Sequence, residues 1–447
     1  MRLLNTTTHN LEFFADEHPP YAILSHRWGN DEVTFQDLEG GHAHEKASYS
    51  KIDMTCSTAA AGGLEYAWID TCCIDKTSSA ELSEAINSMY RWYQDAVVCY
   101  AFLATVHDEK DFWQSDWFKR GWTLQELIAP PVVIFLNWEW KEVGTKLSLC
   151  DTLRGITGIP EDVLRGKDPG LCSIAQRMSW AHNRVTTRIE DMAYCLMGLF
   201  GVNMPMIYGE GKKAFIRLQE EIIKLSDDYT ILAWHQQRRY LEDEYEGLFA
   251  PCPSPFAGAG SFIHTPSIFK TNPITVDGGG IYLTVLLGPP EGGGLRTALL
   301  PCGNLCYDEL FALRLKLSEK GGRYKRVGGT SLAHSQATDD SFDLARICVQ
   351  RGTQKIEAGL ALGGLAARGN LAGMKLMLGK GLHPLIRRPA CEKALVSAAI
   401  AGNAEAAKML LEDAALRGAW PYSPLAKVIM NNRQPFVCME TLHCLGT

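Results

Sequence analysis

Four short apolar runs near the start of the chain constrain the fold more than any other feature of this sequence. They span residues 21–25, 64–70, 97–102 and 132–136. Runs of this length without strict alternation are typical of strands that are buried on both faces, as in a parallel sheet. Helical patterns separate the runs. The sequence therefore predicts an α/β fold, a parallel sheet with flanking helices.

Residues 78–93 show the pattern of one of these helices. Apolar residues recur at steps of three and four positions from Leu82 to Tyr93, which places them on one helical face. Either Ser78 or Ser79 can cap the amino end of the helix. The order of strand, helix and strand is that of a βαβ unit.

Changes in composition divide the chain into four predicted regions. Residues 1–150 hold the α/β core, and residues 151–237 continue in helical patterns. Residues 238–335 are dense in proline and glycine between short strand-like runs, which predicts a small antiparallel β domain. Residues 336–447 begin as a linker and end in further helical patterns.

A repeat is present in the last region. Three pairs of positions are 33 residues apart: Gly369 and Gly402, Leu378 and Leu411, and Leu362 and Leu395. A period of 33 residues with paired helices resembles the ankyrin repeat. Two such units are fewer than a repeat stack usually needs, so a plain helical hairpin is the alternative.

Composition and charge exclude several classes of protein. The formal net charge of −7 and the lack of a basic stripe argue against nucleic acid as a partner. The longest apolar run, Ala96–Ala104, is about half of what a membrane span requires. The fourteen cysteines form no CxxC pair, and no histidines stand at zinc spacing, so we expect reduced thiols, no metal site and a cytoplasmic location.

Polar residues follow the first two apolar runs where each run ends. In parallel α/β sheets, ligands bind beyond the carboxyl ends of the strands. The sequence therefore predicts a ligand-binding site there, and its candidate residues are Ser25, His26, Arg27, Trp28, Asp70 and Asp75.

The segment RGWTLQELIAP, residues 120–130, adds a further set of candidates. It predicts a short helix that stops at Pro130 and carries Glu126 four residues after Trp122, on the same side of the helix. A carboxylate in a segment suited to burial is costly unless it is paired or used. Glu126 is the candidate catalytic residue, with Arg120 and Trp122 beside it.

The glycine-rich piece GEGKK, residues 209–213, resembles a phosphate-binding loop only superficially. The first glycine of that motif would fall at Met206, and Lys213 stands where a serine or threonine would hold magnesium. We therefore expect no nucleotide triphosphate at this loop.

The blocks YAILSHRWG (21–29), YAWIDTCCIDK (66–76), SSAELSEAINSMYRWY (78–93) and RGWTLQELIAP (120–130) occur in an order that resembles the fungal heterokaryon-incompatibility (HET) domain. Residues 188–222 are similar to the segment that follows this domain in many such proteins. The resemblance implies an effector of growth arrest or cell death after non-self recognition, with the C-terminal repeats binding protein partners and the HET domain self-associating.

HET domains in turn look like distant relatives of TIR domains, which have a flavodoxin-like fold and many of which cleave NAD. The TIR patterns are matched by Leu24–Arg27 and by Trp122 to Leu127, with Glu126 at the place of the catalytic glutamate. Thr123 stands where the TIR pattern has cysteine, and His26 where it has an aromatic residue. The resemblance implies that NAD is a possible substrate and that no cofactor is required.

The chemistry of NAD cleavage is compatible with these residues. Loss of nicotinamide builds positive charge on the ribose, which one fixed carboxylate can stabilise, and the cationic leaving group needs no general acid. Trp28 or Trp122 could stack on a base, and Arg27 or Arg120 could hold the pyrophosphate.

Each candidate also has a structural alternative. Glu126 could pair with Arg120 or cap backbone, Arg27 could pair with Asp31 or Glu32, and the tryptophans could be core residues. Ser25 and His26 could hydrogen-bond their loop, and Asp70 and Asp75 could organise the loop after the second run. A non-enzymatic module that recruits cell-death partners is therefore the alternative function.

Overall fold

The computed structural model describes residues 1–235, apart from residue 16, and most of 247–350. The gaps in the second range are 265–271, 279, 305–308, 319–321, 328–330 and 335–342. Beyond residue 350 only positions 371, 405, 408 and 409 are described. The predicted 33-residue repeat thus lies almost wholly outside the described residues and stays a prediction.

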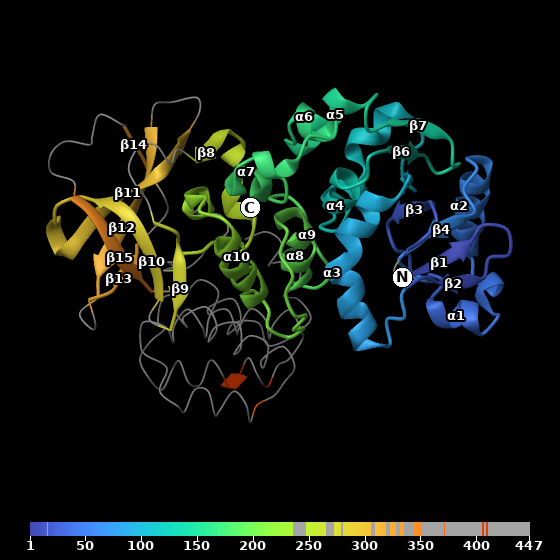
Figure 1. The fold of residues 1–447 in the computed structure, drawn as a ribbon, viewed down its shortest axis with the longest axis horizontal. Coiled ribbons are helices and arrows are strands. Elements are labelled where there is room, and N and C mark those ends of the chain that lie inside the picture. Colours follow the sequence, from blue (N-terminus) through green and yellow to red (C-terminus); the bar gives the residue numbers. More distant parts are fainter. Residues whose placement is uncertain are drawn as a thin grey trace. The chain divides into compact units, whose positions relative to one another are not determined.

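The first sheet has seven strands (Figure 1). They are β1 Arg2–Asn5, β2 Leu11–Phe13, β3 Tyr21–His26, β4 Tyr66–Trp68, β5 Val98–Phe102, β6 Val133–Leu136 and β7 Glu142–Thr145. Their order is β2-β1-β4-β3-β5-β6-β7. All four strands predicted from the apolar runs are present, and they pair in parallel as β4-β3-β5-β6. The antiparallel strands β1, β2 and β7 were not predicted.

Burial explains why the four central strands could be predicted. Every residue of β3 and of β5 is buried, because helices cover both faces of the parallel part of the sheet. The helices of this region are α1 Phe35–Glu39, α2 Tyr49–Ala61, α3 Ser79–Asp95 and α4 Thr123–Ile128. Helix α3 confirms the predicted helix, and the side chain of Ser78, rather than Ser79, accepts from the Glu81 N–H as its cap.

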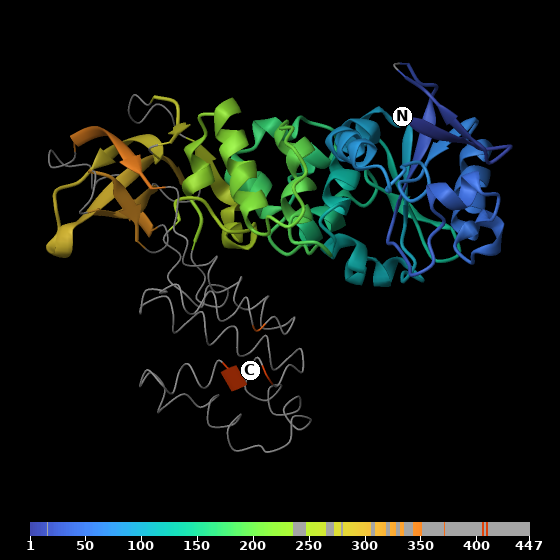
Figure 2. The ribbon, with the colours of Figure 1, turned by 90° about the horizontal axis from the view of Figure 1, so that it is seen from below.

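Helix α2 lies on one side of this sheet, and α3 and α4 lie on the other (Figures 1 and 2). Strand β3 follows the same division, since successive strand residues point to opposite faces. Tyr21 donates its hydroxyl to the Trp92 carbonyl of α3, whereas His26 contacts Lys51 of α2. Ser25 must therefore face the side of α3 and α4.

The predicted helical region after residue 150 is confirmed. Its helices are α5 Cys150–Thr157, α6 Glu161–Leu164, α7 Ile174–Ser179, α8 Asp191–Tyr194, α9 Met197–Phe200 and α10 Lys213–Leu225. Apolar residues at helical spacing in α10 bury one face, which includes Phe215, Leu218 and Ile222.

The strand-rich region forms a second sheet. Its strands are β8 Phe262–His264, β9 Thr275–Asp277, β10 Gly280–Leu287, β11 Leu295–Asn304, β12 Glu309–Leu317, β13 Tyr324–Arg326, β14 Ser331–His334 and β15 Asp343–Val349. All pairs are antiparallel except β13 with β15. The added pairing of β11 with β12 closes the path β12-β13-β15-β10-β11 into a ring.

The second sheet extends beyond residue 335, the predicted end of the β domain. Strand β14 lies inside the predicted β domain, but β15 lies beyond residue 335, in the stretch predicted to be a linker, and belongs to the same sheet. The polar residues between them concealed the alternating pattern of β15, in which Ile347 and Val349 are buried. Residues 1–240 and 247–351 together form one compact unit.

A buried arginine ties the helical region to the second sheet. Arg326 of β13 is fully buried and donates to the carbonyls of Leu232 (3.2 Å), Leu248 (3.0 Å) and Trp234 (3.1 Å). Its guanidinium also lies 3.7 Å from the centroid of the Trp234 ring. Hydrogen bonds to several carbonyls compensate for the burial of this charge.

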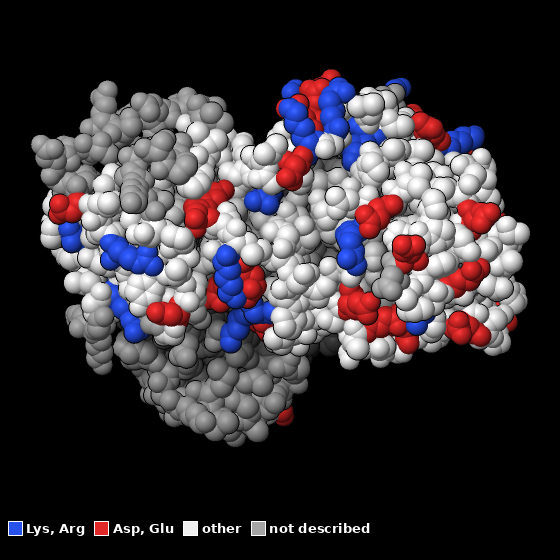
Figure 3. Space-filling view, in the orientation of Figure 1, with Lys and Arg blue, Asp and Glu red and all other residues white. Residues whose placement is uncertain are grey.

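The predictions on cysteines, membrane spans and surface charge can be compared with the described residues. Every cysteine in the described part of the chain is a free thiol, and Cys72 and Cys73 are both buried. Among the described residues, no helix is long and apolar enough to cross a membrane. Acidic and basic side chains are interspersed on the face shown in Figure 3.

Candidate functional site

Glu126 lies at the carboxyl end of β3. Its carboxylate accepts a hydrogen bond from the hydroxyl of Ser25, 101 residues earlier in the chain. The same hydroxyl accepts a hydrogen bond of 2.8 Å from Nε1 of Trp117. Ser25 therefore has one donor and one acceptor, and its proton must point at Glu126.

The backbone around α4 explains why Glu126 reaches this position. The Gly121 N–H donates to the Val185 carbonyl at 2.9 Å, and a Cβ on Gly121 would lie 2.5 Å from Cγ2 of Thr186. Only glycine permits this close approach. Arg184 also donates to the Arg120 carbonyl and to Oγ1 of Thr123, at 2.8 and 2.9 Å.

The carboxyl end of α4 is capped by a lysine. Lys146 is buried and donates from Nζ to the carbonyls of Leu127 (3.3 Å) and Pro130. Burial lowers its pKa to about 8. These bonds satisfy carbonyls that the end of the helix leaves without intrahelical donors.

Replacing Lys146 by methionine should therefore lower the free energy of unfolding by about 2 kcal/mol, because two carbonyls lose a donor. Urea denaturation at pH 7 measures the change. Lys141→Met is the matched control, since Lys141 is exposed and pairs only with Glu139, an arrangement worth little. Equal effects of the two substitutions would contradict the capping role.

Burial controls the acidity of Glu126. The residue is 7% exposed, and burial raises the pKa of its carboxyl to about 8. The hydrogen bond from Ser25 and the charges of Arg120 and Arg184 oppose this shift, whereas the charge of Asp70 adds to it. Glu126 is thus mostly neutral at pH 7, although two arginines are near.

The next residue of β3, His26, holds a second carboxylate. Its Nε2 lies 3.3 Å from Oδ1 of Asp70, and its Nδ1 lies 3.3 Å from Nζ of Lys51. Lys51 also donates to the half-buried carboxylate of Glu32. An ammonium group only donates, so Nδ1 must accept and the ring proton is on Nε2, facing Asp70.

Asp70 also binds Trp28. The indole Nε1 donates to Oδ2 of Asp70 at 2.9 Å, and Nζ of Lys76 lies 3.7 Å from the centroid of the indole ring. Burial would raise the pKa of the Asp70 carboxyl, but the hydrogen bonds from His26 and Trp28 and the charge of Lys76 hold it below its ordinary value. Asp70 is therefore ionised.

The structure thus brings together five of the predicted site residues. Around the end of β3 lie Ser25, His26, Trp28, Asp70 and Glu126. Two aspects of this cluster were not foreseen. Lys51 orients His26 and Trp117 orients Ser25, and both contacts depend on tertiary packing that no spacing in the sequence indicates.

The other predicted residues are placed differently. Arg27 is exposed and pairs with Asp116 at 3.3 Å, so the suggested partners Asp31 and Glu32 are wrong. Asp75 accepts from the N–H and hydroxyl of Thr77 and from Gln36, as the loop-organising alternative predicts.

The predicted position of Trp122 beside Glu126 also needs correction. Trp122 lies beside Asp191, where its indole lowers the pKa of that carboxyl against the larger opposing effect of burial. The indole beside Ser25 and Glu126 is that of Trp117, a core residue. Arg120 is half-buried, and its positive charge lowers the pKa of the Glu126 carboxyl. The position of Trp122 four residues before Glu126 was therefore misleading.

The glycine-rich loop 209–213, which was predicted not to bind a nucleotide triphosphate, binds a carboxylate of the protein itself. The N–H groups of Gly209 and Gly211 donate to Oε1 of Glu190 at 2.8 and 2.9 Å. Burial would raise the pKa of Glu190, but these two N–H groups hold it below its ordinary value. The loop therefore already has a carboxylate where a phosphate would bind.

Glu190→Gln should lower the free energy of unfolding by about 1 kcal/mol at pH 7, because charge-assisted bonds become neutral ones. A depressed folded-state pKa gives stability above the unfolded value of 4.5 that is lost as the pH falls below it. The difference between wild type and variant, measured by urea denaturation, should therefore shrink from pH 7 to pH 3.5. A difference that is constant with pH would contradict this.

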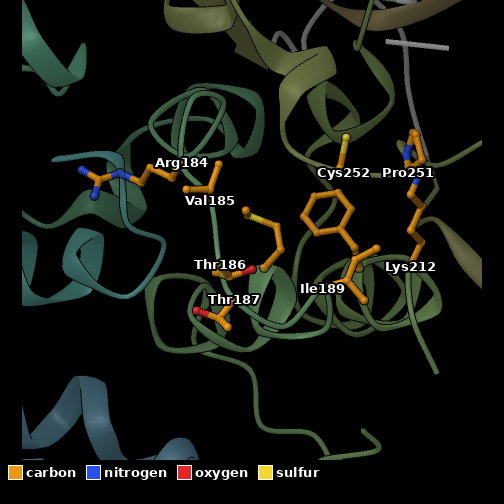
Figure 4. A pocket seen from close by; sticks show the side chains of 10 residues that line it. Arg184, Val185, Thr186, Thr187, Ile189, Lys212, Pro251 and Cys252 are labelled. Atoms are coloured by element: carbon orange, nitrogen blue, oxygen red, sulfur yellow. The ribbon is translucent and has the colours of Figure 1, made fainter. Parts of the chain in front are cut away.

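The described part of the chain has a pocket of about 300 Å³, whose lining side chains are drawn in Figure 4. Its lining consists of residues 184–187, Ile189, Met192, Lys212, Phe215, Pro251 and Cys252. The guanidinium of Arg184 points away from the other lining residues in Figure 4, towards its hydrogen-bond partners near α4. None of the predicted site residues lines this pocket. In the described part of the chain, no group of three or more His, Cys, Asp and Glu side chains could hold a metal ion.

Comparison with known proteins identifies part of the chain. Residues 21–114 match the family model for Heterokaryon incompatibility protein (HET). Over 220 residues, the chain is 50% identical to the Vegetative incompatibility protein HET-E-1 of Podospora anserina. The aligned segment covers 46% of this chain and 16% of that protein. The chain thus spans a small part of the length of this relative. No solved structure matches significantly.

These matches confirm the HET resemblance for the segment that contains Ser25, His26, Arg27, Trp28, Asp70 and Asp75. Glu126, Arg120 and Trp122 lie beyond the segment matched by the family model. The resemblance to TIR domains and to ankyrin repeats stays a prediction.

Proposed function

We propose that this chain is a cytoplasmic effector of fungal vegetative incompatibility, which arrests growth or kills the cell after non-self recognition by cleaving NAD between nicotinamide and ribose. The match to the HET family and the similarity to the Podospora protein support the biological role. One observation carries the chemistry: Glu126 is held by Ser25 at the carboxyl end of β3.

The topology supports a ligand site at this point. The parallel strands have the order β4-β3-β5-β6, so the chain crosses from one side of β3 to the other between β4 and β5. Ligands of open α/β sheets bind where the strand order reverses in this way. The order also agrees with the first four strands of the flavodoxin-like fold, which the TIR resemblance implies.

In the proposed reaction, Glu126 stabilises the positive charge that develops on the ribose when nicotinamide leaves. Burial keeps its carboxyl neutral in the free protein, and the positive charge of the nicotinamide ring of bound NAD would lower its pKa. Trp28, which is 43% exposed, offers an indole face for stacking. Arg27 is exposed and offers a guanidinium for the pyrophosphate once it leaves Asp116.

Control of a toxic activity requires that the protein be inactive until it assembles. We propose that self-association of the HET domain switches on cleavage, and that the C-terminal repeats bind the protein partner that triggers it. Neither nucleic acid nor a bound cofactor has a part in this proposal.

The test is release of nicotinamide by the purified full chain, concentrated to favour assembly, and by Glu126→Gln. The wild type should release nicotinamide, and the variant should do so at least about 100-fold more slowly. Glu45→Gln is the control, because Glu45 is exposed and lies outside the site.

Expression in fungal cells gives a second readout, in which Glu126→Gln should abolish killing and the loss of cellular NAD. Killing by a folded Glu126→Gln variant would instead favour the non-enzymatic alternative. The HET domain would then recruit cell-death partners, and Glu126 would be a packed structural acid.

A further inference from the structure

Two carboxylates are held by consecutive residues at the end of β3. Ser25 donates to Glu126 of α4, and His26 donates to Asp70, which follows β4. Ser25 faces the side of α3 and α4, and His26 faces the side of α2. A ribose placed beyond the end of β3 would therefore have one carboxylate on each side.

The two carboxylates differ in access and in charge. Glu126 is buried, whereas the side chain of Asp70 is 22% exposed and can reach solvent. Oδ1 of Asp70 accepts from His26 and Oδ2 accepts from Trp28, so each oxygen keeps a free lone pair. Pairs of carboxylates in such different environments commonly divide the work of one reaction.

We propose that Asp70 is a second catalytic residue, which accepts a proton from the water that attacks the ribosyl carbon. This inference rests on the proposed cleavage of NAD. Glu126 stabilises the developing ribosyl cation, and Asp70 acts on the nucleophile from the other side.

The proposed reaction breaks one bond to the ribosyl carbon and forms another. The bond between the ribosyl carbon and the nicotinamide nitrogen breaks, and its electron pair leaves with neutral nicotinamide. A new bond forms from the water oxygen to the same carbon, and the water proton passes to Asp70 and then to solvent. The products are ADP-ribose, nicotinamide and one proton.

The polar chain behind Asp70 suits this role. Lys51 binds Nδ1 of His26, which keeps the ring proton on Nε2 and directed at Asp70. Glu32 binds Lys51 and fixes that orientation in turn. Donors on both oxygens restrict the rotation of the carboxylate, so its free lone pairs have defined directions. His26 and Lys51 are accordingly positioning residues.

A nucleophile that competes with water distinguishes the proposed roles of Glu126 and Asp70. A neutral pyridine such as 3-acetylpyridine can replace nicotinamide on the ribose, and it carries no proton that must be removed. Hydrolysis to ADP-ribose needs a base, whereas this exchange does not. Both products are measured in one reaction of the full chain with NAD and 3-acetylpyridine.

We expect Asp70→Asn to lower hydrolysis by about 100-fold or more, as for loss of a general base, and to leave exchange within about threefold. Glu126→Gln should lower both reactions. Asp53→Asn, an exposed position on α2, should change neither. Trp28→Phe removes the indole hydrogen bond but keeps the carboxylate, so it should lower the ratio of hydrolysis to exchange far less than Asp70→Asn does.

Equal loss of both reactions in a folded Asp70→Asn protein would overturn the proposal and make Asp70 a structural or binding residue. Unchanged hydrolysis would also overturn it. If Asp70→Asn does not fold, Asp70→Glu gives the test, since a displaced carboxylate should lower hydrolysis more than exchange. Absence of both reactions in the wild type would refute the proposed NAD cleavage itself, and this inference with it.

Discussion

Glu126→Gln should stabilise the protein against unfolding, by an amount that grows as the pH rises. The folded-state pKa of Glu126 is about 8, above the ordinary value of 4.5. Between these values the unfolded chain ionises this residue while the folded protein keeps it neutral. Wild-type stability therefore falls as the pH rises from about 4.5 to 8 and is level beyond that.

Glutamine has no proton to lose and can still accept the Ser25 hydroxyl. The difference in free energy of unfolding between variant and wild type should be small at pH 5 and reach about 3 kcal/mol at pH 8. This value is smaller than the free energy that the whole pKa shift from 4.5 to about 8 would give. Urea denaturation of wild type and variant at several pH values measures it. Parallel pH profiles would show that Glu126 ionises normally in the folded protein. Glu45→Gln, at an exposed site, should give such parallel profiles.

Arg326→Met should lower the free energy of unfolding by about 3–5 kcal/mol, the range for breaking a buried charged network. The carbonyls of Leu232, Trp234 and Leu248 would each lose a hydrogen bond from the guanidinium, although the Leu248 carbonyl keeps the one from Nε1 of Trp234. The Trp234 ring would lose the cation above it. Arg326→Lys keeps the charge but loses the planar fork, so its effect should be smaller.

Arg314→Met is the matched control for this prediction. Arg314 belongs to the neighbouring strand β12 but is exposed and pairs only at the surface with Glu291, which contributes little. Urea midpoints of the full chain give the comparison. A similar small effect at both positions would mean that the second sheet does not depend on Arg326.

The parallel core could be predicted because its strands are continuous apolar runs, as in β3 and β5. Strand β7 escaped prediction because Glu142–Thr145 lies at the sheet edge and is at least partly exposed along its length, so it carries no apolar signal. Strands β1 and β2 are also short, and no pattern distinguished them from a loop. Strand β15 was hidden behind polar residues interpreted as a linker.

The candidate site was only partly predictable for a similar reason. The rule for strand ends depends on topology alone, and it drew attention to Ser25, His26 and Asp70, which the structure places close to one another. The partners of charged groups depend on tertiary packing instead. Arg27 pairs with Asp116 rather than with its sequence neighbours, and Trp117 rather than Trp122 binds Ser25.

The clamp formed by Arg326 has a practical consequence for engineering. It binds Leu232 and Trp234 on one side of residues 236–246 and Leu248 on the other, so both ends of that connection are fixed at one guanidinium. When both ends of a connection are held in place, the entropic cost of closing it grows only slowly with its length. A fluorescent reporter inserted between residues 235 and 247 should therefore leave the fold intact, which provides a way to test whether the full chain assembles inside cells.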